Sequence, residues 1–363
     1  MSAALRVLVI EDSATLRGYL VDALEAQGFK VVGTAADGER GIALCESLRP
    51  DVISLDIVLT GLNGMEVTAE IMARCPTPIL IVSASRNRGD VFHTMDALSA
   101  GAVEVLDKPG GTEDDDEWAA RYGRMLRLVA GVKVIRRARR RSPTAAAAAP
   151  ARLAIAQEHP RSAFTTPASR QVIAIGASTG GPAALADLLP RLPRDYPLPI
   201  LLVLHLDGAF EQAFCDWLNS LSALPVRLAR EGEALPTHGC VLLAPAGRHL
   251  LVENGRLQFS DSAERHSCRP SIDLLFESLA RSQPRQTLAI LLTGMGSDGA
   301  AGLLALRRAG AMTLAQDEAS SVIYGMPRVA AELGAAQRII PLSELEHCLL
   351  QAAWQHAEAG REY

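Results

Sequence analysis

The stretch Val172-Ile-Ala-Ile-Gly-Ala-Ser-Thr-Gly-Gly-Pro182 decides the interpretation of the second half of the chain. Apolar residues come first, a turn of small residues follows, and a helix-like segment opens at Pro182. A strand that leads through a glycine-rich turn into a helix is the building unit of a parallel α/β sheet. Ser178 therefore lies near the N-terminus of a helix, where free backbone N–H groups and the helix dipole stabilise negative charge.

This stretch has two chemical interpretations. The string Gly176–Gly180 fits G-x-S-x-G, the pattern of a nucleophile elbow, which makes Ser178 a candidate nucleophile. The alternative is a glycine-rich phosphate-binding turn. The string lacks the lysine of a P-loop and does not fit G-x-G-x-x-G.

The same pattern of apolar runs and helical stretches continues on both sides of the turn. Further strand-like runs are Ile200–His205, Val241–Ala244 and Leu288–Gly294, and helical stretches are Pro182–Pro190, Glu211–Leu221, Ser271–Arg281 and Gly299–Ala309. We expect a doubly wound, mostly parallel α/β domain.

A serine nucleophile needs a base, and the base needs a group that orients it. His205 follows the strand-like run at 200–204, and Asp298 lies in a glycine-rich turn after the run at 288–292. Three such residues at strand ends can converge on one crevice, in the unusual chain order Ser, His, Asp. His266, in a polar loop before a helix, is the alternative base, whereas His238 and His249 are expected at the surface.

The first part of the chain has a second α/β pattern. Strand-like runs are Arg6–Ile10, Val31–Thr34, Val52–Asp56, Ile79–Ser83 and Val103–Leu106, and helical stretches are Ala14–Gln27, Gly38–Ser47, Met65–Arg74 and Val91–Ala100. Five strands that alternate with helices predict a parallel sheet with helices on both faces.

Carboxylates gather at the strand ends of this first sheet. Glu11 and Asp12 follow the first strand, and Asp56 closes the third. Such a cluster favours Mg²⁺, which prefers oxygen ligands. Ser83 and Lys108, at the ends of two further strands, add a hydroxyl and a positive charge. Together these groups suit phosphoryl transfer to an aspartate.

Between the two patterns the composition changes. The arginine cluster Arg136–Arg141 is followed by alanine, proline, serine and threonine without apolar periodicity, as in a linker. We expect a first domain at 1–130, a flexible linker at 131–170 and a second domain at 171–357. The arginine cluster is either a nucleic-acid patch or a solvated start of the linker.

Length and composition agree with two domains of a cytoplasmic protein. The chain has 363 residues, 48% of them hydrophobic, and a net charge of −5 that gives no reason to expect a nucleic-acid partner. The sequence shows neither a signal peptide nor a long uncharged apolar run, so we expect no membrane insertion. Six scattered cysteines without a C-x-x-C pair indicate reduced, mostly buried thiols.

The first pattern resembles the response-regulator receiver family over about residues 4–128, a flavodoxin-like fold. The resemblance rests on the Glu11-Asp12 pair, Asp56 in Ser-Leu-Asp-Ile, the Ser83-Ala84 pair and Lys108-Pro109. It implies that Asp56 is the phospho-acceptor, that Glu11, Asp12 and Asp56 hold Mg²⁺, and that Ser83 and Lys108 contact the phosphoryl group. A sensor histidine kinase is then the implied phosphodonor.

The second pattern resembles the catalytic domain of the chemotaxis-type protein-glutamate methylesterases, over about residues 170–353. The matching strings are Ile175–Pro182, Arg265-His266 with Arg269–Phe276, Leu292–Ala300, and Ala315–Val322 with Gly325–Pro327. The order of receiver, linker and esterase matches that family too.

The resemblance implies the role of each site residue. Ser178 is the nucleophile, His205 the general base and Asp298 its orienter. The backbone N–H of Met295 helps to form the oxyanion hole, and Thr179 shapes the same pocket. No cofactor is implied for the esterase reaction.

The resemblance also implies the activity. The protein would hydrolyse glutamate γ-methyl esters, and by similar chemistry deamidate glutamine, on the cytoplasmic domains of chemoreceptors. The receiver would cover the crevice, and phosphorylation of Asp56 would shift the population toward an open state. The competing hypotheses are a catalytically idle, phosphorylation-dependent interaction module and a receiver fused to a DNA-binding output.

The sequence departs from the two families at three places. The receiver family usually has a proline shortly after the phospho-acceptor, where this chain has Ile57–Gly61, and an aromatic residue where it has Val105. The esterase family usually follows its histidine with a Met-Pro-Pro-Gly-Phe-like string, where this chain has His205-Leu-Asp-Gly-Ala-Phe210. These changes put in doubt coupling through an aromatic ring and the properties of the loop beside the base.

Overall fold

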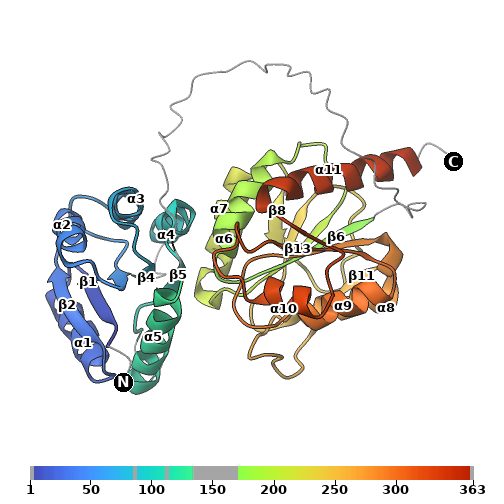
Figure 1. Ribbon diagram of the computed structural model, residues 1–363. Coiled ribbons are helices and arrows are strands. Elements are labelled where there is room, and N and C mark those ends of the chain that lie inside the picture. Colours follow the sequence, from blue (N-terminus) through green and yellow to red (C-terminus); the bar gives the residue numbers. More distant parts are fainter. Residues whose placement is uncertain (1–3, 85–87, 111–113, 133, 135–170, 360–363) are drawn as a thin grey trace, which may run out of the picture.

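The computed structural model describes residues 4–84, 88–110, 114–132, 134 and 171–359, which form two α/β domains side by side (Figure 1). The receiver domain has a five-stranded parallel sheet in the order β2-β1-β3-β4-β5. Its strands are β1 (Arg6–Ile10), β2 (Lys30–Ala35), β3 (Val52–Leu55), β4 (Ile79–Ser83) and β5 (Glu104–Asp107). Its helices are α1 (Ala14–Glu25), α2 (Gly38–Leu48), α3 (Gly64–Arg74), α4 (Arg88–Ala100) and α5 (Asp115–Ala130).

Local sequence explains where these elements begin. The central strands β3 and β4 are buried along their whole length, which is why they are continuous apolar runs rather than alternating ones. Asp37 caps α2 by accepting a hydrogen bond from the backbone N–H of Arg40, and Asn63 and Glu66 form a capping box at α3.

The catalytic domain has a seven-stranded parallel sheet in the order β14-β13-β12-β6-β7-β9-β8, and an antiparallel hairpin, β10-β11. Its strands are β6 (Val172–Ala177), β7 (Ile200–Leu204), β8 (Val226–Leu228), β9 (Val241–Leu243), β10 (His249–Glu253), β11 (Arg256–Ser260), β12 (Thr287–Leu291), β13 (Met312–Gln316) and β14 (Arg338–Ile340). Its helices are α6 (Gly181–Leu188), η1 (Leu189–Arg191), η2 (Gly208–Phe210), α7 (Glu211–Leu221), α8 (Ile272–Ser282), η3 (Pro284–Gln286), α9 (Ala300–Arg308), α10 (Met326–Glu332) and α11 (Leu342–Ala359).

The strand order of this sheet reverses at β6. The chain proceeds from β6 outward through β7 on one side and through β12 to β14 on the other. A reversal of strand order of this kind separates the loops that follow the neighbouring strands. The carboxyl ends of β6, β7 and β12 therefore form the expected place for a site.

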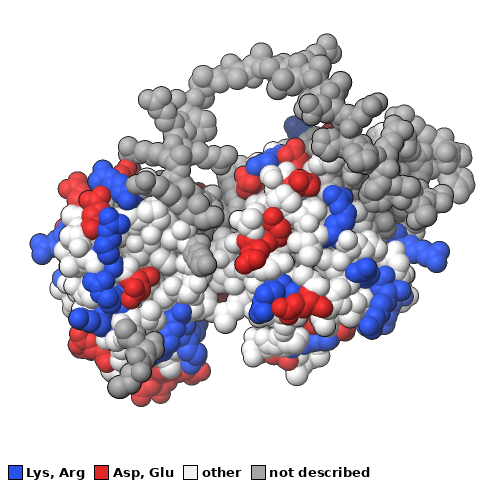
Figure 2. Space-filling model, in the orientation of Figure 1, with Lys and Arg blue, Asp and Glu red and all other residues white. Residues whose placement is uncertain are grey.

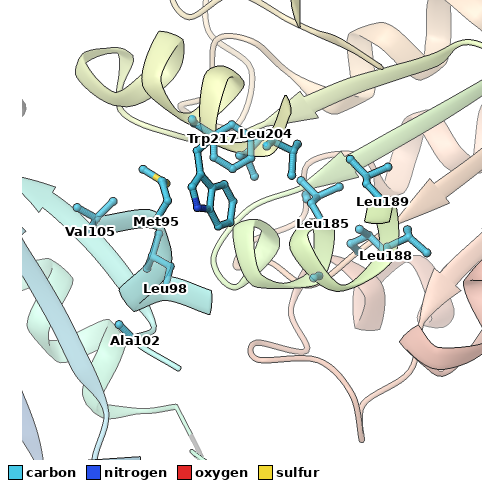
Figure 3. Close-up of a cluster of buried hydrophobic side chains, with 14 of the residues drawn as sticks. Met95, Leu98, Ala102, Val105, Leu185, Leu188, Leu189, Leu204 and Trp217 are labelled. Carbon is cyan, nitrogen blue, oxygen red and sulfur yellow. The ribbon is translucent and has the colours of Figure 1, made fainter. Parts of the chain in front are cut away.

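The two domains meet through an apolar interface. One continuous cluster of buried side chains includes residues of both domains. Met95 and Leu98 of α4, with Val105 of β5, face Leu185 of α6 and Trp217 of α7 (Figure 3). The receiver therefore rests on the helices that flank the carboxyl ends of β6 and β7.

Two polar contacts border this apolar interface. The indole Nε1–H of Trp217 donates a hydrogen bond of 2.9 Å to the Asp96 carboxylate of α4. Arg121 of α5 pairs with Asp207 at 3.3 Å. Asp207 lies two residues after His205, so the altered loop that follows His205 contacts the receiver.

The predicted fold class is confirmed for both domains, and every predicted strand and helix is present to within a few residues. The strands β8, β13 and β14 and the hairpin were not predicted. The expected linker and the Arg136–Arg141 cluster lie outside the described residues, apart from residues 131, 132 and 134. In the described part of the chain, no helix combines the length and apolar character needed to cross a membrane.

Charge is mixed over the surface. Figure 2 shows Lys and Arg side chains interspersed with Asp and Glu on the visible face, without a broad basic stripe. A nucleic-acid-binding surface is expected to concentrate basic residues on one face. The visible face therefore gives no support to a DNA-binding output.

Candidate active site

Ser178 lies in the turn between β6 and α6. Its backbone N–H donates to the Thr293 carbonyl at 3.0 Å, which ties the turn to the loop after β12. Gly180, at φ 80°, occupies the left-handed region and is the N-cap of α6. A side chain is disfavoured at that φ, and a Cβ there would lie 2.5 Å from Val322. The glycine thus allows the tight turn that leaves Ser178 partly exposed at the head of the helix.

His205 lies at the end of the adjacent strand. Leu204 pairs with Ala177 in the sheet, so His205 and Ser178 leave their strands at the same level. His205 Nε2 is 2.9 Å from Asp298 Oδ2, and its Nδ1 is 3.6 Å from the Cys268 thiol. Within the described residues these two groups, and not Ser178, are the hydrogen-bond partners of the ring. Catalytic hydrogen bonds are often made only when substrate is bound.

Asp298 is held by the N-terminus of α8. Its carboxylate accepts hydrogen bonds from the Ser271 hydroxyl at 2.7 Å and from the backbone N–H groups of Ile272 at 2.7 Å and Asp273 at 3.1 Å. Burial raises the pKa of Asp298, but the hydrogen bond and charge of His205, with these donors, outweigh burial and hold that pKa below its ordinary value. Asp298 is therefore a fixed anion beside the imidazole.

The two hydrogen-bond partners of the His205 ring, Asp298 and Cys268, raise its pKa. Burial lowers it, but the hydrogen bonds to Asp298 and Cys268 outweigh burial and raise the pKa to about 9. Both hydrogen-bond partners therefore favour the protonated ring. A general base must be neutral to accept a proton, so the ring has to lose this proton before it acts as a base.

The alternative base has different surroundings. His266 is exposed, and its Nε2 faces Asp273 at 3.2 Å rather than Asp298. The expectation that His249 is at the surface is wrong. His249 is fully buried on β10, and its Nδ1 accepts the backbone N–H of Ser271, because the hairpin packs against the start of α8.

The proposed oxyanion and pocket residues lie around the nucleophile. Thr179 is almost fully buried, and its backbone carbonyl accepts the hydroxyl of Thr293 at 3.0 Å. Gly294 approaches so closely that a Cβ on it would lie 2.6 Å from the Cβ of Ser178. Met295 follows directly, with an exposed side chain. The loop after β12 thus brings backbone close to Ser178.

In the receiver, the predicted residues meet at the strand ends. Lys108 Nζ lies 2.8 Å from Asp56 Oδ2 and 2.9 Å from Glu11 Oε2. Ser83 is buried and accepts a hydrogen bond of 3.3 Å from the Thr94 hydroxyl. Burial raises the pKa of Asp56. Burial and the charge of Asp56 also raise the pKa of Glu11. Lys108 opposes both shifts.

The donor set of this receiver site fits Mg²⁺. Carboxylate oxygens of Glu11, Asp12 and Asp56 lie within 4.8 Å of one another. Glu11 and Asp56 are buried, and Asp12 is exposed, so the cluster is open to solvent on one side. Oxygen ligands with an open side are what Mg²⁺ requires, since it keeps several water ligands.

All six cysteines are free, and five of them are buried, as predicted. The sixth, Cys268, touches the imidazole, and its role was not anticipated because loop geometry decides it. Ser271 was also missed as a partner of Asp298.

The fold and these two sites define a class of protein: a response-regulator receiver joined to an α/β domain with a Ser-His-Asp site. Comparison with known families gives the same division. Residues 7–116 match the response regulator receiver domain, and residues 173–349 match CheB methylesterase.

The chain belongs to the family of protein-glutamate methylesterases. It is 43% identical to a protein-glutamate methylesterase/protein-glutamine glutaminase of Anaeromyxobacter dehalogenans, over 95% of this chain and 96% of that protein. It is 40% identical to a relative with the same two activities in its name from Nitrosospira multiformis, over 98% of both chains.

Proposed function

We propose that this protein is a phosphorylation-regulated enzyme that hydrolyses glutamate γ-methyl esters on the cytoplasmic domains of chemoreceptors. By the same chemistry it deamidates glutamine side chains, as the names of its relatives suggest. The observation that carries the proposal is the Asp298–His205 hydrogen bond beside the Ser178 turn, at the carboxyl ends of neighbouring strands.

In the proposed reaction Ser178 attacks the ester carbonyl. His205 accepts the serine proton at Nδ1, the ring nitrogen that Asp298 does not engage. Asp298 holds the ring and stabilises the imidazolium that forms. Backbone N–H groups of the turn and of Met295 hold the oxyanion, methanol leaves, and water hydrolyses the acyl-enzyme.

Regulation is proposed to act through Asp56. A sensor histidine kinase supplies the phosphoryl group, and Glu11, Asp12 and Asp56 hold Mg²⁺. When bound, this ion offsets the negative charge on the phosphoryl oxygens. Lys108 now pairs with Glu11 and Asp56, so a phosphoryl group on Asp56 would redirect its ammonium. The receiver contacts that cover the site then weaken.

Ser178→Ala tests the catalytic role. The variant should release no methanol from methylated receptor membranes, because no other group replaces the attacking oxygen. Its melting temperature should stay close to that of the parent protein, since the side chain is small and partly exposed. Full activity in Ser178→Ala would contradict the triad assignment.

A fluorophosphonate separates an enzyme from an idle interaction module. An activated serine reacts with this probe, whereas an idle fold does not. Labelling of the parent protein but not of Ser178→Ala supports the enzyme. Absence of labelling in protein shown to be folded and phosphorylated would favour the interaction module.

A further inference from the structure

A cysteine lies beside the base of the candidate triad. Cys268 Sγ is 3.6 Å from His205 Nδ1, and both side chains are partly exposed. With Asp298 they form a group in which one ligand atom of each residue lies within 4.8 Å of the others. Among the described residues three such groups of His, Cys, Asp or Glu occur, and this one alone contains sulfur. Sulfur and imidazole together are ligands for a soft divalent cation.

The separation of the sulfur and the nitrogen fits tetrahedral Zn²⁺. Zn–S bonds are about 2.3 Å long, and Zn–N bonds are about 2.0–2.1 Å long. At the tetrahedral angle of about 109° these lengths place the two ligand atoms about 3.6 Å apart. This is the distance between Cys268 Sγ and His205 Nδ1, so one ion can bind both atoms with little movement of either side chain.

Asp298 supplies the support that a metal-binding histidine usually has. Its carboxylate engages His205 Nε2 at 2.9 Å, which in the neutral ring places the proton on Nε2 and leaves the Nδ1 lone pair for an ion. The carboxylate is itself held at 2.7 Å by the Ser271 hydroxyl and at 2.7 Å by the backbone N–H of Ile272. The orientation of the ring is therefore fixed before an ion binds.

The loop that carries Cys268 is also held in place. The backbone N–H of Cys268 donates to the Arg265 carbonyl at 2.9 Å, and the N–H of Arg265 donates to the Cys268 carbonyl at 3.2 Å. Between them, His266 and Ser267 adopt positive φ of 54° and 58°. Paired backbone thus positions the sulfur beside the ring.

The charges suit a divalent cation. The Cys268 thiol releases its proton to water when it binds a metal ion, and the thiolate and the Asp298 carboxylate then balance the two charges of Zn²⁺. Arg265, in the same loop, is already paired with Asp273 at 3.4 Å and with Glu277 at 2.7 Å. Mg²⁺ prefers oxygen ligands and therefore favours the carboxylates of the receiver.

We propose that His205 and Cys268 bind Zn²⁺ as a reversible inhibitor of the esterase, with Asp298 supporting the histidine and water completing the coordination. A site with two protein ligands stays open to exchange, unlike a closed structural zinc site. The ion would occupy Nδ1, the atom that receives the Ser178 proton in the proposed reaction. The metal site rests on geometry, whereas its effect on catalysis rests on the proposed function.

The first measurement detects an ion at the sulfur. Co²⁺ takes the tetrahedral sites of Zn²⁺, and a thiolate ligand gives it a charge-transfer absorption band. The full-length protein, with excess Mg²⁺ to fill the receiver site, should show this band, and added Zn²⁺ should remove it. Cys268→Ser should lack the band, and Ser267→Ala, in the same loop, should keep it. A hydrogen bond between thiol and imidazole alone would give no band.

The second measurement is the rate of fluorophosphonate labelling with and without Zn²⁺. Zn²⁺ should slow labelling of the parent protein and of Ser267→Ala, and a chelator should restore the rate. Cys268→Ser should need at least about tenfold more Zn²⁺ for the same slowing, because loss of even a supporting group weakens a metal site by that factor. Each variant is compared with itself without the ion, because Cys268→Ser also alters the surroundings of His205.

Each outcome decides the proposal. A cobalt band and a slowing of labelling that both require Cys268 support it. Absence of the band in folded parent protein, a band without slowing, or equal slowing of the parent and Cys268→Ser overturns it. If no protein is labelled even without Zn²⁺, Ser178 is not a nucleophile, and the cobalt band still decides the metal site. Normal labelling without methanol release from methylated receptor contradicts the proposed substrate and leaves the metal result intact.

Discussion

At the scale of single residues, the charges of Asp298 and His205 depend on groups outside the candidate triad as well as on each other. Asp298 is stabilised as an anion by the N-terminus of α8, and His205 is stabilised as a cation by Asp298 and Cys268. Because the pKa of folded His205 is raised from 6.5 to about 9, its charge stabilises the fold fully below pH 6.5. That contribution is lost as pH rises through about 9.

Cys268→Ser should move the pH dependence of Ser178 reactivity to lower pH. The thiol is one of the groups that raise the pKa of His205, so its removal lets the ring become neutral at a lower pH. The measurement is the rate of fluorophosphonate labelling against pH. Ser267→Ala, in the same loop, is the control and should keep the parent profile. An unchanged profile for Cys268→Ser would show that the thiol does not act on the base.

The sequence predicted Ser178, His205 and Asp298 as a candidate triad with Asp298 beside His205, but not the other hydrogen-bond partners of these residues. Ser178, His205 and Asp298 stand out because each follows an apolar run, and parallel strands bring such ends to one edge of the sheet. Cys268 could not be assigned, because its position depends on a loop in which His266 and Ser267 adopt positive φ. No local pattern encodes that path.

At the scale of elements, the central strands of the catalytic sheet were predictable, and its edge strands β8 and β14 were not. Strands β6, β7 and β12 are fully buried and therefore read as continuous apolar runs. Strands β8 and β14 have three residues each and include exposed or partly exposed positions. Short edge strands depend on pairing with a neighbour, which sequence pattern does not show.

Gly294→Ala tests how tightly the loop after β12 packs on the nucleophile. The new Cβ would lie 2.6 Å from the Cβ of Ser178 and 2.3 Å from Met326 Cε. The methionine end can move, whereas Ser178 Cβ is attached to backbone, so the nucleophile must shift. A displacement of about 1 Å can lower the rate by roughly 10²-fold, which kcat/KM for methanol release would show.

Gly18→Ala is the control for this substitution. A Cβ at Gly18 meets nothing within 4 Å, so the change should leave activity intact. Normal activity in Gly294→Ala would contradict the close approach of the loop to Ser178.

At the scale of the whole molecule, the sequence predicted two domains and the resemblance implied a receiver over the crevice, but the side chains that join the domains were not predicted. The interface depends on side chains that have no periodic signal, such as Asp96, Arg121 and Asp207. It also explains two departures from the family patterns. Val105 is part of the apolar interface, and Asp207 pairs with Arg121 of the receiver. Both changes therefore lie where the receiver covers the catalytic domain.

The central claim is that phosphorylation of Asp56 uncovers an esterase. The most direct test is methanol release from methylated receptor membranes, with Mg²⁺ and with or without phosphoramidate, a small phosphodonor. We expect release to rise with phosphoramidate in the parent protein and to stay at the basal rate in Asp56→Asn. Release that is equal in both proteins under both conditions, or absent from folded and phosphorylated protein, would contradict the account.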